Sequence, residues 1–129
     1  MIKVILCLVL FFIFSPGYSQ SGGSNPSYFS IEPPIVVNVY HPDRIKFLQV
    51  DTQVKVNDSS VIDAIEFHKP AIRHAMLMLL SSQKIDEMKT VKGKEKLRKE
   101  ALRTIKKVLK ENTGNEGVTE LYFTGFIIQ

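Results

Sequence analysis

Cysteine is nearly absent from this sequence of 129 residues, and its scarcity excludes several kinds of chemistry. The single cysteine, Cys7, lies in an apolar run at the N-terminus, so the rest of the chain has no thiol that could form a disulfide, bind a metal ion or attack a substrate. Hydrophobic residues still make up 44% of the chain, which is ordinary for a globular protein. Length and composition therefore predict one domain with one core.

Sequence patterns of catalysis and metal binding are missing as well. The histidines His41, His68 and His74 have no glutamate at the spacing of a zinc-binding helix, and the last two are six residues apart, on different faces of any helix. The serine pairs at 59–60 and 81–82 lie outside nucleophile motifs and are interpreted as helix caps. Acidic residues are scattered singly, and no glycine spacing forms a phosphate loop. We therefore expect a protein that is not an enzyme, with no catalytic, cofactor or metal site.

The first residues have the pattern of a targeting segment. Lys3 precedes an uninterrupted apolar run from Val4 to Phe14, and small residues follow up to Ser19. The run is shorter than the roughly 20 residues of a membrane-spanning helix, so residues 1–19 are interpreted as a signal peptide, with a short membrane anchor as the alternative. Both alternatives predict export. Residues 20–27 are rich in glycine and serine and predict a flexible linker before a folded domain at 28–129.

Residues that favour strands stand at both ends of this domain. Segments 28–31 and 35–39 predict two short strands, separated by Pro33 and Pro34. Segment 44–56 predicts a longer strand with a bulge near Phe47, and segment 118–128 predicts the last one. The expected inward-facing residues are Leu48, Val50, Val54 and Val56 in the longer strand, and Leu121, Phe123 and Ile127 in the last.

Helical spacing of apolar residues occupies the chain between these strands. A first helix is expected around 61–67, and Pro70 suits the first turn of a second helix that ends at the serines 81–82. A short turn at 84–88 precedes Thr90, which is a good N-cap for a long helix running to about Asn112. Its expected buried residues are Leu97, Ala101, Ile105, Val108 and Leu109. The order of strands, helices and strand predicts an α+β domain, with helices on one face of a mainly antiparallel sheet of about four strands.

Positive charge is concentrated in one segment. Residues 84–110 contain eleven lysines and arginines against four acids (+7), and the remainder contains six against nine (−3), which together give the net charge of +4. A candidate partner surface therefore consists of Lys92, Lys96, Lys99, Arg103, Lys106 and Lys110. Such a surface suits an acidic partner or anionic lipid headgroups, and a merely solvated face is the alternative. Nucleic acid is not expected, because the chain is exported and no aromatic residues alternate with these cations.

Four sequence blocks, in order, resemble the FliL family. Residues 47–51 (FLQVD) are similar to its "YLKVD" strand, and residues 69–82 (KPAIRHAMLMLLSS) to "P-x-IRxAILMLLSS". Residues 90–97 (TVKGKEKL) are similar to "T-x-EGKEKL", and residues 121–129 (LYFTGFIIQ) to "VYFTDFVVQ". The matching motif positions are Pro70, Ile72, Arg73, Leu79, Leu80, Ser81, Ser82, Phe123 and Thr124. The chain departs from the pattern at Lys92, where an acid is common, and at Gly125, where aspartate is common.

This resemblance implies a domain related to stomatin-like (SPFH) folds, displayed on the periplasmic side of the inner membrane, or in the periplasm if the leader is cleaved. It implies a protein of the flagellar basal body that assembles around the MotA/MotB stator and supports motility and chemotaxis. We further expect copies of the chain to form a ring or partial ring. The segment from Tyr28 to Tyr40 is a second candidate for contacts. The alternative function is a periplasmic binding module whose basic helix holds an acidic envelope polymer or a lipid surface.

Overall fold

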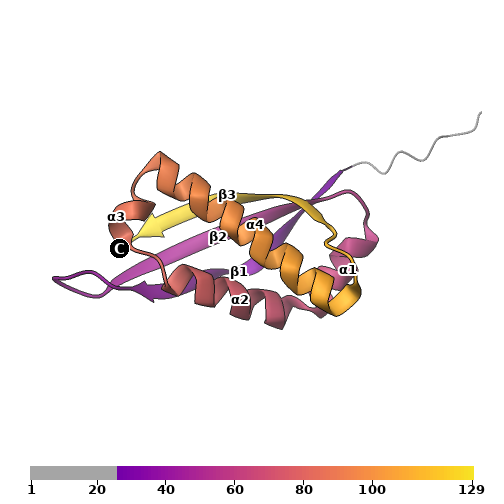
Figure 1. Ribbon diagram of the computed structural model, residues 1–129, viewed down its shortest axis with the longest axis horizontal. Helices are drawn as coiled ribbons and strands as arrows, with labels where there is room; N and C mark the ends of the chain where they lie inside the picture. Colours follow the sequence, from indigo (N-terminus) through magenta and orange to yellow (C-terminus); the bar gives the residue numbers. More distant parts are fainter. Residues whose placement is uncertain (1–25) are drawn as a thin grey trace, which may run out of the picture.

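The computed structural model describes residues 26–129, which form a sheet covered on one face by helices (Figure 1). Three antiparallel strands, β1 (Ser27–Val39), β2 (Lys46–Val56) and β3 (Val118–Ile128), are arranged in the order β1-β2-β3. Between β2 and β3 the chain forms α1 (Ser60–Phe67), α2 (Lys69–Ser81), α3 (Ile85–Met88) and α4 (Val91–Thr113). The predicted α+β class is confirmed. The predicted targeting segment lies outside the described residues, and β1 begins at the last residue of the predicted linker.

β2, the central strand, has the alternation that its sequence predicts. Four of its side chains are fully buried beneath the helices: Leu48, Val50, Val54 and Val56. Thr52 shares this face, and its hydroxyl is buried with no hydrogen-bond partner among residues 26–129, which costs stability. The bulge predicted near Phe47 is wrong, because β1 and β2 pair regularly through that residue.

β1 is one strand where the sequence predicted two. Its pairing with β2 runs from Ser27 to Ile31 and resumes at Ile35, after a bulge that contains Pro33 and Pro34. Proline has no N–H to donate, but an edge strand needs donors on one side only, so β1 continues through the bulge. The sheet formed by residues 26–129 therefore has three strands instead of about four.

β3 has the predicted bounds but changes phase along its length. Leu121 is buried and Phe123 is partly buried on the helix side, as predicted. A bulge at Thr124 then adds one residue to the strand, so Ile127 lies on the opposite face and is 44% exposed. The prediction that Ile127 faces inward is wrong. Two other residues pack against the core in its place, Phe126 and Ile128.

The ends of α2 and α4 follow from their sequences. Pro70 lies in the first turn of α2, where its missing N–H is not needed. The Thr90 hydroxyl caps α4 by accepting a hydrogen bond from the Gly93 N–H at 2.9 Å. Gly114 ends α4 with a φ of 78°, a left-handed conformation that glycine adopts without a steric cost. The two helices bury Ile72, Met76, Leu80, Leu97, Ala101, Ile105 and Leu109, and Val108 is only partly buried.

Met76 and Met78 offer a matched test of which face of α2 supports the fold. Met76 is fully buried, whereas Met78 is 60% exposed on the same helix. We predict that Met76→Ala lowers the free energy of unfolding by about 2–5 kcal/mol, because it leaves a cavity in the core. Met78→Ala should change it by less than about 0.5 kcal/mol. Urea unfolding followed by circular dichroism measures both, and equal losses would contradict the packing described.

Gly93 allows the end of α3 to pack against the first turn of α4. A Cβ at position 93 would collide with the carbonyl oxygen of Glu87, which already accepts a hydrogen bond from the Thr90 hydroxyl at 2.9 Å. A glycine in a helix normally costs roughly 1 kcal/mol relative to alanine. At this position, however, the close approach of the backbone excludes any side chain.

We therefore predict that Gly93→Ala destabilises the protein by about 1–3 kcal/mol, against the direction of helix propensity. Lys99→Ala, at an exposed position of the same helix, should have an effect within about 0.5 kcal/mol. Thermal and urea unfolding of the two variants test this prediction. A stabilised Gly93→Ala variant would show that the two helices are not in close contact.

Candidate functional site

The cations of the candidate partner surface lie along one face of α4. Lys92, Lys96, Lys99, Arg103, Lys106 and Lys110 are separated by four, three, four, three and four residues, and this spacing keeps them on a single helical face. We call these six residues the basic stripe. It is about 27 Å long at 1.5 Å per residue. Because the buried residues of α4 occupy the opposite side of the helix, the stripe points away from the sheet.

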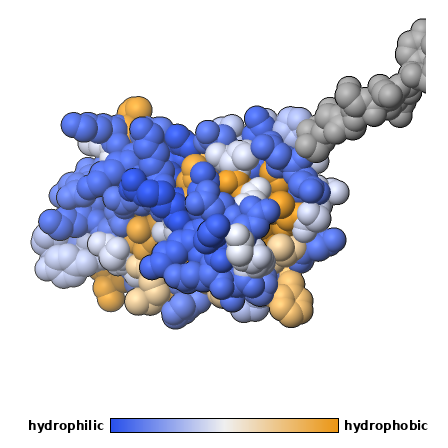
Figure 2. Space-filling view, turned by 45° about the vertical axis from the view of Figure 1, so that its right-hand side comes forward, coloured by the Kyte–Doolittle hydropathy of each residue, from blue (hydrophilic) through white to orange (hydrophobic). Residues whose placement is uncertain are grey.

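Most cations of the stripe have no ion-pair partner within the described part of the chain. Lys106 approaches Glu116 at 3.8 Å, and no carboxylate of residues 26–129 lies within pairing distance of the other five. These five are exposed, and four of the six line a shallow hollow of about 370 Å³ together with Glu95. Figure 2 shows hydrophilic residues over most of the visible face, with hydrophobic ones in scattered spots. The stripe is thus available to an external anionic group.

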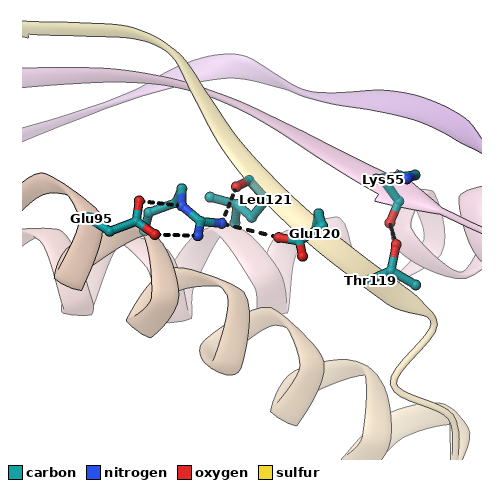
Figure 3. Close-up of polar contacts among 6 residues, drawn as sticks. Lys55, Glu95, Thr119, Glu120 and Leu121 are labelled. Atoms are coloured by element: carbon teal, nitrogen blue, oxygen red, sulfur yellow. Dashed lines mark hydrogen bonds and ion pairs between the residues drawn. The ribbon is translucent and has the colours of Figure 1, made fainter.

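Arg98 lies beside the stripe but has a structural role. Its guanidinium donates two hydrogen bonds to the Glu95 carboxylate, at 2.6 and 2.8 Å, and reaches from α4 to β3 (Figure 3). There it donates to the Glu120 carboxylate at 3.2 Å and to the main-chain carbonyl of Leu121 at 3.1 Å. These hydrogen bonds, chiefly that with Glu95, raise the pKa of Arg98. We call this group the Arg98 clamp, since it joins the helix layer to an edge of the sheet.

The sequence predicted that the cations of the basic stripe form one surface on α4, but it did not predict the Arg98 clamp. The spacing of Glu95 and Arg98, three residues apart on a helix, indicates one ion pair. The partner on β3 is 22 residues further along the chain, and no local pattern connects Arg98 to it. A second contact near that end of β3 was also not predicted: the Thr119 hydroxyl donates to the carbonyl of Lys55 at 3.2 Å (Figure 3).

Several motif positions have roles within the fold. Ile72 and Leu80 are buried, and Leu79 and Phe123 pack against the core. Arg73 donates a hydrogen bond from α2 to the carbonyl of Pro33 in the bulge of β1.

The serines of the motif close the C-terminal end of α2. The hydroxyl of Ser81 donates to the Leu77 carbonyl at 2.7 Å, and that of Ser82 donates to the Leu79 carbonyl at 2.8 Å. Their interpretation as residues that end the helix agrees with this geometry. Thr124 is exposed at the bulge of β3.

The glycine that departs from the family pattern also has a local reason. Gly125 pairs with Asp51 across the sheet, and a Cβ at position 125 would collide with the Asp51 carboxylate. Two aspartates directly opposite each other would repel, so glycine here accommodates the carboxylate of β2.

The second candidate surface, from Tyr28 to Tyr40, forms most of β1. Its outward-facing residues include Tyr28, Val36 and Tyr40, which are 55%, 53% and 80% exposed. The Tyr28 ring lies 6.2 Å from that of Tyr122 on β3, so the two aromatic rings flank the central strand. This face carries no helix in residues 26–129.

Each of the three histidines has a separate local environment. His41 lies in the turn after β1, where its Nδ1 accepts a hydrogen bond from the Asp43 N–H at 3.3 Å. His68 packs edge-on against Phe67 at 5.0 Å, and His74 is exposed on α2. Among residues 26–129, no three histidine, cysteine or acidic side chains come together in the geometry of a metal site.

Fold and surface together define a small α+β domain whose most distinctive external feature is a linear array of cations. The chain belongs to the FliL family: the family model described as "Flagellar basal body-associated protein FliL" matches residues 28–129. The "Flagellar protein FliL" of Aquifex aeolicus (strain VF5) is 31% identical over 101 residues, which cover 78% of this chain and 60% of that protein. The chain thus spans less than two thirds of that relative's length.

Family membership confirms the resemblance identified from the four sequence blocks and indicates a protein associated with the flagellar basal body. The helices of residues 26–129 include none that is both long enough and apolar enough to cross a membrane.

The Arg98 clamp predicts a measurable pKa change at Glu95. The hydrogen bonds from Arg98 are the main cause that lowers the pKa of Glu95 from its ordinary value of 4.5, and Lys99 contributes least. We predict that Arg98→Gln returns this pKa toward 4.5, whereas Lys99→Gln shifts it much less. NMR titration of the Glu95 side-chain carboxyl carbon measures both values. Equal shifts in the two variants would show that the clamp is not the cause.

A carboxylate with a lowered pKa stabilises the fold above its unfolded pKa, and this contribution is lost as the pH falls through the folded value. The free energy of unfolding of the natural protein should therefore decrease more steeply than that of Arg98→Gln as the pH falls below about 4.5.

Proposed function

We propose that this protein is a non-catalytic accessory of the flagellar basal body that binds the motor stator and supports motility. The observation that carries this proposal is the basic stripe, in which five exposed cations without an ion-pair partner in residues 26–129 follow one helix. Family membership supplies the flagellar context. The stripe supplies a surface that attracts and orients an acidic partner.

The proposed mechanism depends on binding energy and not on catalysis. Copies of the domain pack side by side in a ring or partial ring, on the periplasmic side of the inner membrane. This assembly favours the engaged conformation of a MotA/MotB-type stator because it binds that state better than the disengaged one. The outward-facing residues of the segment from Tyr28 to Tyr40, most of which belongs to β1, offer a second surface for contacts between copies or with the stator.

Reversing two charges of the stripe tests this role. We predict that Lys99→Glu with Arg103→Glu weakens association with the stator about tenfold and reduces swimming in viscous medium, because like charges would then face an acidic partner. The matched control is Arg44→Glu with Lys84→Glu, which makes the same change in net charge at exposed positions outside the stripe. Co-purification with the stator and swimming speed measure the effect.

Equal loss in the control would indicate a general effect of net charge instead of a contact at the stripe. Normal swimming of a deletion strain, in both liquid and viscous medium, would contradict the proposed role altogether.

The second candidate function is a binding module for an acidic envelope polymer or an anionic lipid surface. The linear arrangement of the stripe favours it, since an array about 27 Å long matches repeated anionic groups as well as a protein surface. The dependence of binding on ionic strength distinguishes the two functions. Binding to anionic vesicles only at low ionic strength supports the module, whereas co-purification with the stator at moderate salt supports the accessory role.

A further inference from the structure

The two edges of the sheet differ in their capacity to accept another strand. The edge formed by β1 is interrupted by a bulge with two prolines, and Arg73 already binds the carbonyl of Pro33. Such features block pairing with a further chain. The edge formed by β3 contains no proline, and within residues 26–129 only the carbonyl of Leu121 is occupied there, by Arg98. Beyond Leu121, no strand of residues 26–129 pairs with this edge, which we call the open edge.

The register of β3 identifies the main-chain groups that face this open edge. Phe47 and Gln129 exchange two hydrogen bonds of 2.9 Å, one from each N–H to the other carbonyl. In an antiparallel pair, residues that exchange hydrogen bonds alternate with residues whose N–H and C=O point away from the partner strand. Counting back from Gln129, Ile127 and Gly125 point toward β2, and Ile128 and Phe126 point outward.

A groove lies beside the same open edge. Val91 and Lys94 of α4 and Tyr122, Phe123 and Phe126 of β3 line most of a hollow of about 400 Å³. The first turns of α4 extend beyond β3 in Figure 1. Val91 is 86% exposed, which is unusual for an aliphatic residue next to two phenylalanines.

Edge and groove are aligned with each other. Phe126 and Ile128 present outward main-chain groups and direct their side chains to the helix side, where both pack against the core. Residues directly opposite each other in paired strands project from the same face, and neighbouring strands lie about 4.8 Å apart. A strand added to β3 would therefore place every second side chain in the groove beneath α4.

We propose that β3 accepts an extended segment of a partner protein as a fourth strand, with apolar side chains at alternate positions and acidic residues at its ends. The apolar positions match Val91 and the two phenylalanines. The acidic ends match Lys94, whose amino group lies 5.1 Å from the centre of the Phe126 ring and has no ion pair within residues 26–129. Main-chain hydrogen bonds supply affinity, and the groove selects the side chains.

A fluorescent peptide of sequence Asp-Val-Thr-Val-Thr-Val-Asp is a direct probe. We expect it to bind the natural chain and to slow the hydrogen exchange of the Phe126 and Ile128 amides about tenfold, with no change at Gly125 and Ile127. There are two control peptides: one carries N-methyl groups on its three valines, and the other carries them on its two threonines. Because only every second amide faces β3, one of these peptides should bind normally and the other should not.

Variants of the protein complete the test. Val91→Asp and Lys94→Glu should each weaken binding about tenfold, and Lys107→Glu, at an exposed position near the far end of α4 and outside the basic stripe, should change it less than about twofold. Absence of binding at about 1 mM peptide, or equal binding of both N-methylated peptides, would overturn the proposal. Protection of the same amides by self-association alone would assign the edge to a second copy of the chain and would also overturn it. None of these outcomes bears on the stator contact proposed for the basic stripe.

Discussion

Burial of one face of β2 is the constraint on which the other features depend. Leu48, Val50, Val54 and Val56 are removed from solvent only if helices cover that side of the sheet, and α2 and α4 provide the cover. Burial of α4 on its Leu97–Leu109 side in turn directs the basic stripe outward, because the two sets of residues lie on opposite faces of one helix. The outward position of the basic stripe is thus a geometric consequence of the core.

Two arginines then connect the helix layer to the edges of the sheet. Arg73 reaches from α2 to the Pro33 carbonyl of β1, and Arg98 reaches from α4 to the Leu121 carbonyl of β3. Each satisfies a main-chain acceptor on an edge strand. The edges are not equivalent, however, because β1 combines this contact with a proline bulge, whereas no strand of residues 26–129 pairs with β3 beyond Leu121. This asymmetry is the basis of the fourth strand proposed at β3.

Much of the fold could be predicted from local patterns. The alternation in β2, the Thr90 cap and the helical spacing in α4 each depend on neighbouring residues, so composition and period were sufficient to locate them. The errors occur at bulges. One extra residue in β3 changes the face that later side chains occupy, whereas two extra residues in β1 interrupt its pairing without changing the face. Both bulges depend on pairing with β2. For this reason Ile127 was placed on the wrong face and β1 was divided into two strands.

The sequence alone determined the fold class, the helix boundaries and the charge of α4, because short-range spacing fixes which side of a helix or strand is apolar. It also determined the family, through four blocks that carry core and capping residues as well as surface ones. Only the tertiary structure decided that Arg98 joins α4 to β3 and that the outward amides of β3 lie beside a groove. Both depend on contacts between residues far apart in the chain, which local patterns do not encode.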